Sequence, residues 1–224
     1  MKTVADPHFW ASSWATVYGL SSAQAASILH ILGYSYSVVL NTLTSGFNLS
    51  VNTAAGIVKG IGANASDLAN ALKTGAQAST QQALSILKDL GYSVGDIGGA
   101  IKSIYNVGGD QLASALKQVG YGANDIAGVL KNAFGYTGDQ VGNALNSVGY
   151  GVQDIADVLK NTFSWNAQDI TGYLKNTLGQ SSDAINSVLG AIGFSASEIG
   201  SAIGSFFGDV GNTIKNGFCG IFGC

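Results

Sequence analysis

The sequence is poor in several residue types, and their scarcity narrows its possible functions. It contains no arginine, one glutamate, one proline, two cysteines and two histidines in 224 residues, and only 10 % of its residues are charged. Nucleic acids are bound mainly through basic patches, so we expect no nucleic-acid partner for a chain with a net charge of −3. Two cysteines supply neither a disulfide framework nor a complete zinc site, and we expect no metal and no cofactor.

Long apolar segments are also missing. No uninterrupted apolar run of about 18 residues occurs, which argues against a conventional membrane-spanning helix. The residues after Met1 lack the apolar run of a signal peptide, so the extracellular, secreted location that we expect requires that a signal was removed earlier. Hydrophobic residues still make up 46 % of the chain, enough to form a buried core, which argues against disorder.

What the chain does contain is an internal repeat. Glycine recurs every 29 residues, at Gly33, Gly62, Gly91, Gly120 and Gly149. Aspartate keeps the same step at Asp67, Asp96, Asp125, Asp154 and Asp183, and lysine keeps it at Lys73, Lys102, Lys131 and Lys160. The register shows no insertion or deletion, and the 202 residues from Ala23 to Cys224 correspond to about seven such units. The chain is therefore a tandem repeat, rich in glycine.

Each unit contains two helical segments. Within residues 110–119 and again within residues 125–134, apolar residues are spaced i, i+3, i+4 and i+7, which predicts one apolar stripe on each of two helices. We expect Asp110 and Asp125 to act as N-caps. Such short helices are marginal alone and need neighbours. The sequence thus predicts an all-α fold, an α-solenoid (superhelix) of about seven 29-residue helical-hairpin repeats.

The ends of the chain depart from the repeat. Residues 1–22 lie outside the register, and Asp6-Pro7 followed by Trp10 and Trp14 predicts an aromatic N-terminal capping helix over the repeats of residues 23–224. The expected glycine is replaced by Leu178 and Phe207 near the C-terminus, as is common in terminal repeats.

Residues suited to catalysis are scarce. His30 occupies a position that is lysine in other units, such as Lys59, and we expect it to be a solvated residue at a helix end. The serines and threonines have no associated His/Asp arrangement to activate a nucleophile. We therefore predict that the protein is not an enzyme and has no catalytic residues.

The lysine row is the candidate interaction surface, and it consists of Lys73, Lys102, Lys131 and Lys160, with Trp165 as a more exposed aromatic residue. Either these lysines complement helix dipoles and aid solubility, or they form a periodic ladder for an anionic polymer. The helix positions that we expect to face outward, including Ala127, Gly128, Asn132 and Ala156, are small and monotonous. Monotony favours a periodic partner, such as a polymer, a lipid surface or another copy of the chain, or a structural spacer.

Tandem pairs of short helices that carry a lysine resemble the DNA-reading repeats of transcription-activator-like effectors. This chain departs from that pattern in its 29-residue period, its lack of arginine and its negative charge, and it has no hypervariable dipeptide in a loop. The resemblance therefore implies no DNA binding here.

The C-terminal segment is apolar and forms a candidate cap or membrane-contacting segment through Phe206, Phe207, Phe218, Ile221 and Phe222. Cys219 and Cys224 enclose a flexible loop and either form a disulfide or remain free thiols. Two functions follow. The first is a non-enzymatic structural, assembly or recognition scaffold for a protein, a periodic polymer or its own copies. The second is a secreted membrane-active or toxin-associated module that uses the apolar tail.

Overall fold

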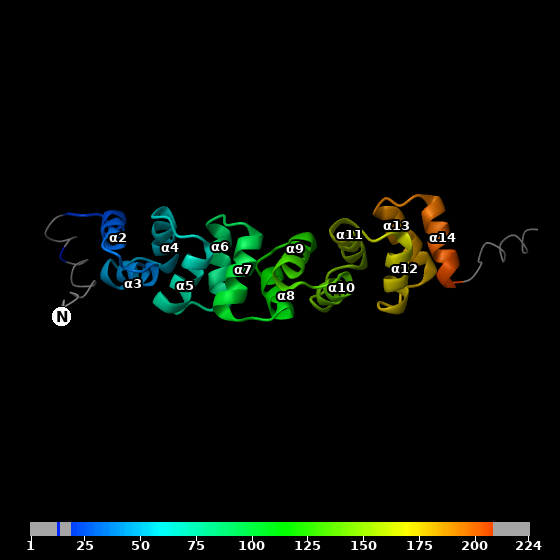
Figure 1. Ribbon diagram of the computed structural model, residues 1–224, viewed down its shortest axis with the longest axis horizontal. Helices are drawn as coiled ribbons and strands as arrows, with labels where there is room; N and C mark the ends of the chain where they lie inside the picture. The colour runs from blue at the N-terminus through cyan, green and yellow to red at the C-terminus, as the bar shows by residue number, and fades with distance from the viewer. Residues whose placement is uncertain (1–12, 14–18, 208–224) are drawn as a thin grey trace, which may run out of the picture. The chain divides into compact units, whose positions relative to one another are not determined.

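The fold is built from helices alone in the part of the chain that the computed structural model describes, which is Ser13 and residues 19–207. Thirteen helices and no strands occur within these residues, joined by short loops (Figure 1). The all-α prediction is confirmed. The predicted capping helix with Trp10 and Trp14, and the tail beyond Phe207, lie outside the described residues.

Two compact units divide the chain. The first comprises the chain up to Tyr121 together with Asn132–Phe134, and the second comprises Gly122–Lys131 and the chain from Gly135 onwards. The helices that begin in the first unit are α2 (Ser22–Ile31), α3 (Tyr36–Gly46), α4 (Val51–Gly60), α5 (Ala65–Gly75), α6 (Thr80–Asp89), α7 (Val94–Tyr105) and α8 (Gly109–Gln118). Those that begin in the second are α9 (Ala123–Phe134), α10 (Gly138–Ser147), α11 (Val152–Phe163), α12 (Ala167–Asn176), α13 (Ser182–Ala191) and α14 (Ala196–Phe207).

The helix boundaries follow the sequence repeat. Every second helix begins 29 residues after the one before it, at Ser22, Val51, Thr80, Gly109, Gly138, Ala167 and Ala196. The other series begins at Tyr36, Ala65, Val94, Ala123 and Val152 and then at Ser182, one residue later than the period requires. The expectation of an uninterrupted register is therefore wrong at α13. There the left-handed backbone is supplied by Gly179 (φ 64°) rather than by the register position Leu178, because glycine has no Cβ to clash.

The helices begin earlier than the aspartates suggested. Asp125 is the third residue of α9, whose N-cap is Gly122, and Asp110 is the second residue of α8, whose N-cap is Gly108. The prediction that these aspartates are N-caps is thus wrong. Polar caps stand one turn earlier, as at α5, where the Asn64 side chain accepts from the amide of Asp67 at 2.9 Å and the Asp67 carboxylate accepts from the amide of Asn64. This reciprocal pair satisfies two of the free amides of the first turn.

The core of each unit forms between helices that are adjacent or next but one along the chain. In the first unit, α5 packs against both α3 and α7, and Leu68 and Leu72 of α5 are fully buried. In the second unit, α12 packs against α14, and Ile170 and Leu174 are fully buried. Since a helix with neighbours on two sides buries more than one stripe, Ala127 is fully buried as well.

The same reasoning corrects the expected outer face. Ala156 is also fully buried, so neither alanine belongs to the surface that we expected. Asn132 is exposed and Gly128 is half-buried. The small side chains at these alanine positions therefore serve close helix packing rather than an external partner.

Candidate functional site

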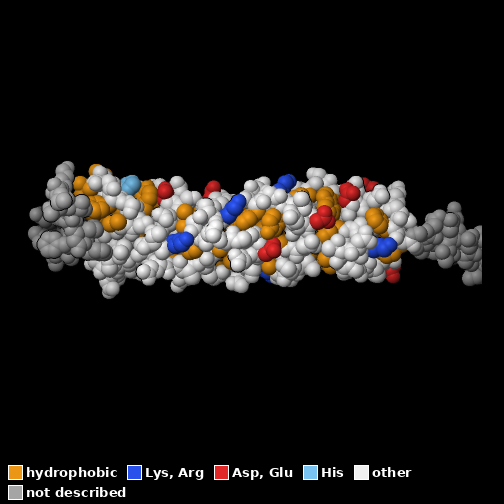
Figure 2. Space-filling view, turned by 60° about the horizontal axis from the view of Figure 1, so that its bottom comes forward, with side chains coloured by type: hydrophobic (Ala, Val, Ile, Leu, Met, Phe, Trp, Pro, Cys, Tyr) orange, Lys and Arg blue, Asp and Glu red, His pale blue; other side chains and the backbone are white. Residues whose placement is uncertain are grey.

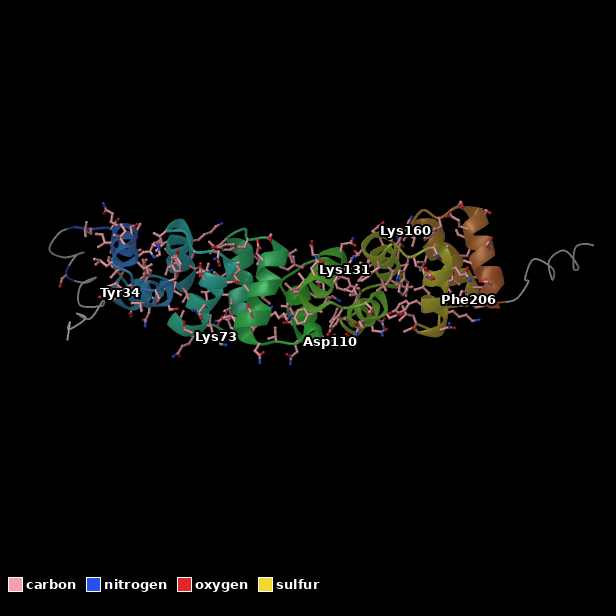
Figure 3. The ribbon with its side chains drawn as sticks, in the orientation of Figure 1. Tyr34, Lys73, Asp110, Lys131, Lys160 and Phe206 are labelled. Carbon is pink, nitrogen blue, oxygen red and sulfur yellow. The ribbon has the colours of Figure 1, made fainter. Side chains whose placement is uncertain are left out.

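The lysines of the predicted surface bind backbone carbonyls of later helices. The Nζ atoms of Lys102, Lys131 and Lys160 donate hydrogen bonds to the carbonyls of Ala133 (2.5 Å), Thr162 (2.6 Å) and Ile192 (2.5 Å), respectively (Figure 3). Lys73 donates in the same way to the carbonyl of Ile104. In each case the acceptor lies at the C-terminal end of the second helix further along the chain.

An aromatic ring completes each of these contacts. The lysine ammonium lies 5.4 Å from the ring centroid of Tyr105 for Lys73, 4.8 Å from that of Phe134 for Lys102, 5.1 Å from that of Phe163 for Lys131 and 4.5 Å from that of Phe194 for Lys160. We call this arrangement of lysine, terminal carbonyl and ring a lysine clamp. It recurs in the other helix series at Lys59, Lys88 and Lys175.

The chemistry of the clamp follows from the helix end. The last four carbonyls of a helix have no partner within it and carry the negative end of the helix dipole, so an ammonium group satisfies and complements them. The ring adds a cation–π attraction of about 0.5–2 kcal/mol, depending on desolvation. The lysines thus join successive helices. Lys73, Lys102 and Lys131 stay exposed and Lys160 is half-buried, and their use as an external interaction surface remains a prediction.

The sequence analysis missed the clamp because the partners lie far apart in the chain. The acceptor follows the lysine by 31 residues at Lys131 and by 32 at Lys160, consistent with the late start of α13. The constant spacing from lysine to a later aromatic residue was the available signal. On the face shown in Figure 2, the lysine side chains stand singly rather than in one basic patch.

His30 takes the lysine position in α2 but is not a solvated residue, so that expectation is wrong. It is half-buried, and its ring stacks on Tyr36 with centroids 4.7 Å apart and an interplanar angle of 18°. Its Nε2 lies 3.4 Å from the Tyr36 hydroxyl. A neutral stack replaces the lysine clamp at this place.

Trp165 is packed against its own unit. The ring lies on Gly138, where an added Cβ would be 2.6 Å from Trp165 Cζ2. It meets the Tyr173 ring edge-on, with centroids 6.0 Å apart. Tyr173 is 4 % exposed, and its hydroxyl donates to Asn143 Oδ1 at 3.0 Å. Burial, with a smaller contribution from the nearby Asp139 carboxylate, raises the pKa of Tyr173 to about 12.

These rings line an open groove with a cavity volume of about 550 Å³. Trp165, Tyr173 and Phe206 form its aromatic part, and Asp139 and Asp169 are its two carboxylates. We call it the aromatic–acidic groove. Phe206 comes from α14, where its ring packs on Gly172 (Figure 3). The remaining members of the apolar tail, Phe218, Ile221 and Phe222, lie outside the described residues, as do Cys219 and Cys224.

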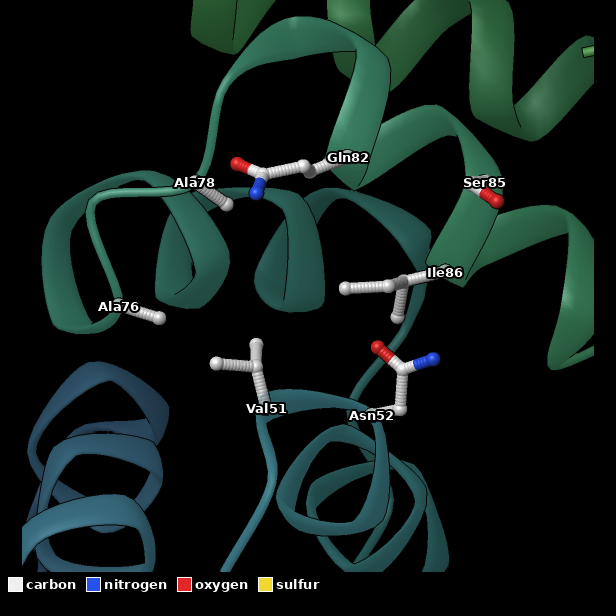
Figure 4. Close-up of a pocket in the computed structure, with 7 residues that line it drawn as sticks. All are labelled: Val51, Asn52, Ala76, Ala78, Gln82, Ser85 and Ile86. Atoms are coloured by element: carbon white, nitrogen blue, oxygen red, sulfur yellow. The ribbon is translucent and has the colours of Figure 1, made fainter.

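A second cavity, of about 220 Å³, lies in the first unit (Figure 4). Its lining is uncharged and includes Val51, Asn52, Gln82 and Ile86. The Gln82 side chain already accepts from the amide of Ser79 at 2.9 Å. This cavity offers no charged group to orient a ligand.

Two further findings concern the described residues alone. Within them, no three His, Cys, Asp or Glu side chains are grouped so that they could hold a metal ion. None of the helices there is long and apolar enough to cross a membrane.

Comparisons with protein-family models, with curated proteins and with solved structures found no match to this chain.

Proposed function

We propose that the protein is a non-enzymatic scaffold, an α-solenoid of about seven 29-residue helical-hairpin units preceded by a capping helix in residues 1–22. Its long repeated surface would contact a protein, a periodic polymer or a second copy of the chain. Stacked repeats suit this role because each unit contacts only its neighbours and the surface grows with their number.

The observation that carries this proposal is the recurrence of the lysine clamp. Seven lysines of the described residues make the same contact with the second helix further along, from Lys59 at one end to Lys175 at the other. A contact repeated at the sequence period supports a stack of equivalent units. Recurring polar residues with a structural use also favour a scaffold over a catalytic protein.

Removal of one whole unit tests the architecture. Deleting residues 80–108 removes 29 residues and places Lys59 opposite Val119, and Lys73 opposite Ala133, so that both clamps can form again. We expect a helical protein that unfolds cooperatively at a lower denaturant concentration. Deleting residues 80–94 removes α6 out of register and should abolish cooperative unfolding. Equal damage from both deletions would contradict the proposed repeat.

A vesicle assay tests the scaffold against the membrane-active alternative. The full chain and a truncation after Phe207, which preserves α14, are incubated with anionic and zwitterionic vesicles. A scaffold should neither sediment with the vesicles nor cause leakage. Leakage by the full chain that the truncation abolishes would favour the membrane-active module.

A further inference from the structure

The aromatic–acidic groove has a chemistry that the scaffold role does not use. Three of its eight lining residues carry aromatic rings and two carry carboxylates, and the lining contains no lysine. The amides of Gln168 and Asn176 complete its polar part. The lining therefore has a formal charge of −2 beside apolar ring surfaces.

The aromatic part of the groove is fixed in place. Trp165 rests on Gly138 and Tyr173 on Gly142, where an added Cβ would lie 2.5 Å from the Tyr173 hydroxyl oxygen. The Trp165 and Tyr173 rings meet at 72°. Phe206 rests on Gly172, where an added Cβ would lie 2.9 Å from its Cζ. Rings held by packing lose little freedom when a ligand binds, which favours affinity.

The carboxylates lie on the exposed side of the groove. Asp139 is the second residue of α10 and Asp169 the third residue of α12, and both are exposed. Asp169 Oδ2 accepts from the amide of Asn166 at 3.4 Å, and the amide of Asp169 donates to Asn166 Oδ1 at 2.9 Å. With this amide satisfied by a side chain and two carboxylates nearby, an anion is disfavoured and a cation favoured.

The rest of the molecule shows that rings in this chain hold ammonium groups. Lysine Nζ atoms lie 4.4–6.0 Å from ring centroids in the lysine clamps. One of these lysines, Lys175, lies 6.0 Å from the Phe206 centroid and 4.4 Å from that of Phe207, with its ammonium bound to the carbonyl of Phe206. The lysines that the structure places over rings within residues 19–207 use rings other than Trp165 and Tyr173.

We propose that the aromatic–acidic groove binds a small quaternary ammonium compound, with its methyl groups against the rings and its charge near Asp139 and Asp169. A quaternary ammonium is weakly hydrated and is attracted by the faces of aromatic rings. Its positive charge gains from both carboxylates. A neutral sugar could stack on the rings but would gain nothing from the charge of −2.

Choline and its uncharged isostere, 3,3-dimethylbutan-1-ol, test the proposal on the full chain. Binding is followed by calorimetry and by ligand-observed NMR in sodium phosphate buffer free of organic amines, with glucose as a third probe. We expect choline to bind with a millimolar dissociation constant, about tenfold or more tighter than the isostere, and to weaken as salt is added. Equal binding of choline and the isostere, tighter binding of glucose, or no binding of choline would each overturn the proposal.

Matched variants locate the site. The double substitution Asp139→Asn and Asp169→Asn changes exposed residues and keeps an acceptor at the N-cap pair, and it should weaken choline binding about tenfold while leaving the isostere unchanged. Asp110→Asn changes the equivalent second residue of α8 in the first unit and should have no effect. Choline binding that survives the double substitution, or falls equally with Asp110→Asn, would place the site elsewhere and overturn the proposal.

Discussion

Two helix junctions of the same series, α6 with α8 in the first unit and α10 with α12 in the second, are held together by different chemistry. Lys88 of α6 forms a clamp with the carbonyl of Val119 and the ring of Tyr121. The corresponding position in α10 is Asn146, whose side chain is shorter and uncharged. There the contact is made by Tyr173 and Trp165 packing on Gly142 and Gly138.

The exchange between these junctions conserves size. Leu84 and Ala115 of the first junction correspond to Gly142 and Tyr173 of the second, so a large residue on one helix has moved to the other. Thr80 and Val107 likewise correspond to Gly138 and Trp165. Cores tolerate substitutions that keep total volume, which explains how one repeat accommodates both solutions. The clamp is polar and exposed, whereas the aromatic junction is largely apolar.

The largest expected effect compares the core with a clamp at adjacent residues. Leu130 is fully buried, so Leu130→Ala should lower the free energy of unfolding by about 2–5 kcal/mol. Lys131→Ala removes one clamp and should cost about 0.5–2 kcal/mol. Denaturant unfolding of both variants measures the two losses, and equal shifts would mean that the face assignment of α9 is wrong.

The aromatic junction is tested by filling its notch. Gly142→Ala places a Cβ 2.5 Å from the Tyr173 hydroxyl oxygen and should lower stability by about 1–3 kcal/mol. Gly128→Ala is the matched control, because nothing lies within 4 Å of the added Cβ in the middle of α9. It should stabilise the protein by up to about 1 kcal/mol. Loss of stability in both variants would argue against a specific notch.

Salt separates the two junctions. Lys102→Met keeps the aliphatic stem and removes the ammonium that lies 4.8 Å from the Phe134 centroid, and it should cost about 0.5–2 kcal/mol. Because salt screens exposed charges, this loss should shrink in about 1 M sodium chloride. The loss caused by Gly142→Ala should stay the same. Thermal melts at both salt concentrations provide the comparison, and parallel behaviour would contradict the chemical distinction.

The sequence was sufficient for the elements and insufficient for their junctions. The spacing of Ile126, Val129 and Leu130 is local and identified the buried face of α9, and all three residues are buried. The N-caps were misplaced, because Gly122 has no side chain to mark one. The clamp partner of Lys131 lies 31 residues away, so it becomes visible only once the neighbouring helices are known. Trp165 looked exposed because its partner Gly138 carries no pattern of its own.

A smaller effect concerns the second helix series. Its C-terminal left-handed positions are Asn48, Gln77, Asn106, Gly135, Ser164 and Gly193, again at the 29-residue period, and four of them are not glycine. This row also escaped the sequence analysis. Gln77 (φ 52°) is strained there, and Gln77→Gly should stabilise the protein by about 0.5–1 kcal/mol. Asn70→Gly inside α5 should not. A loss on Gln77→Gly in chemical denaturation would contradict this reasoning.

The central claim, that lysines join successive helices, is tested most directly by a double-mutant cycle at Lys131 and Phe163. The Lys131 ammonium lies 5.1 Å from the Phe163 centroid and donates to the carbonyl of Thr162 at 2.6 Å. Lys131→Met combined with Phe163→Leu should give a coupling energy of about 0.5–1 kcal/mol. Lys131→Met combined with Phe194→Leu, a ring that belongs to the Lys160 clamp, should give a coupling near zero. A coupling of zero at Lys131 and Phe163, or equal couplings in both cycles, would contradict the account.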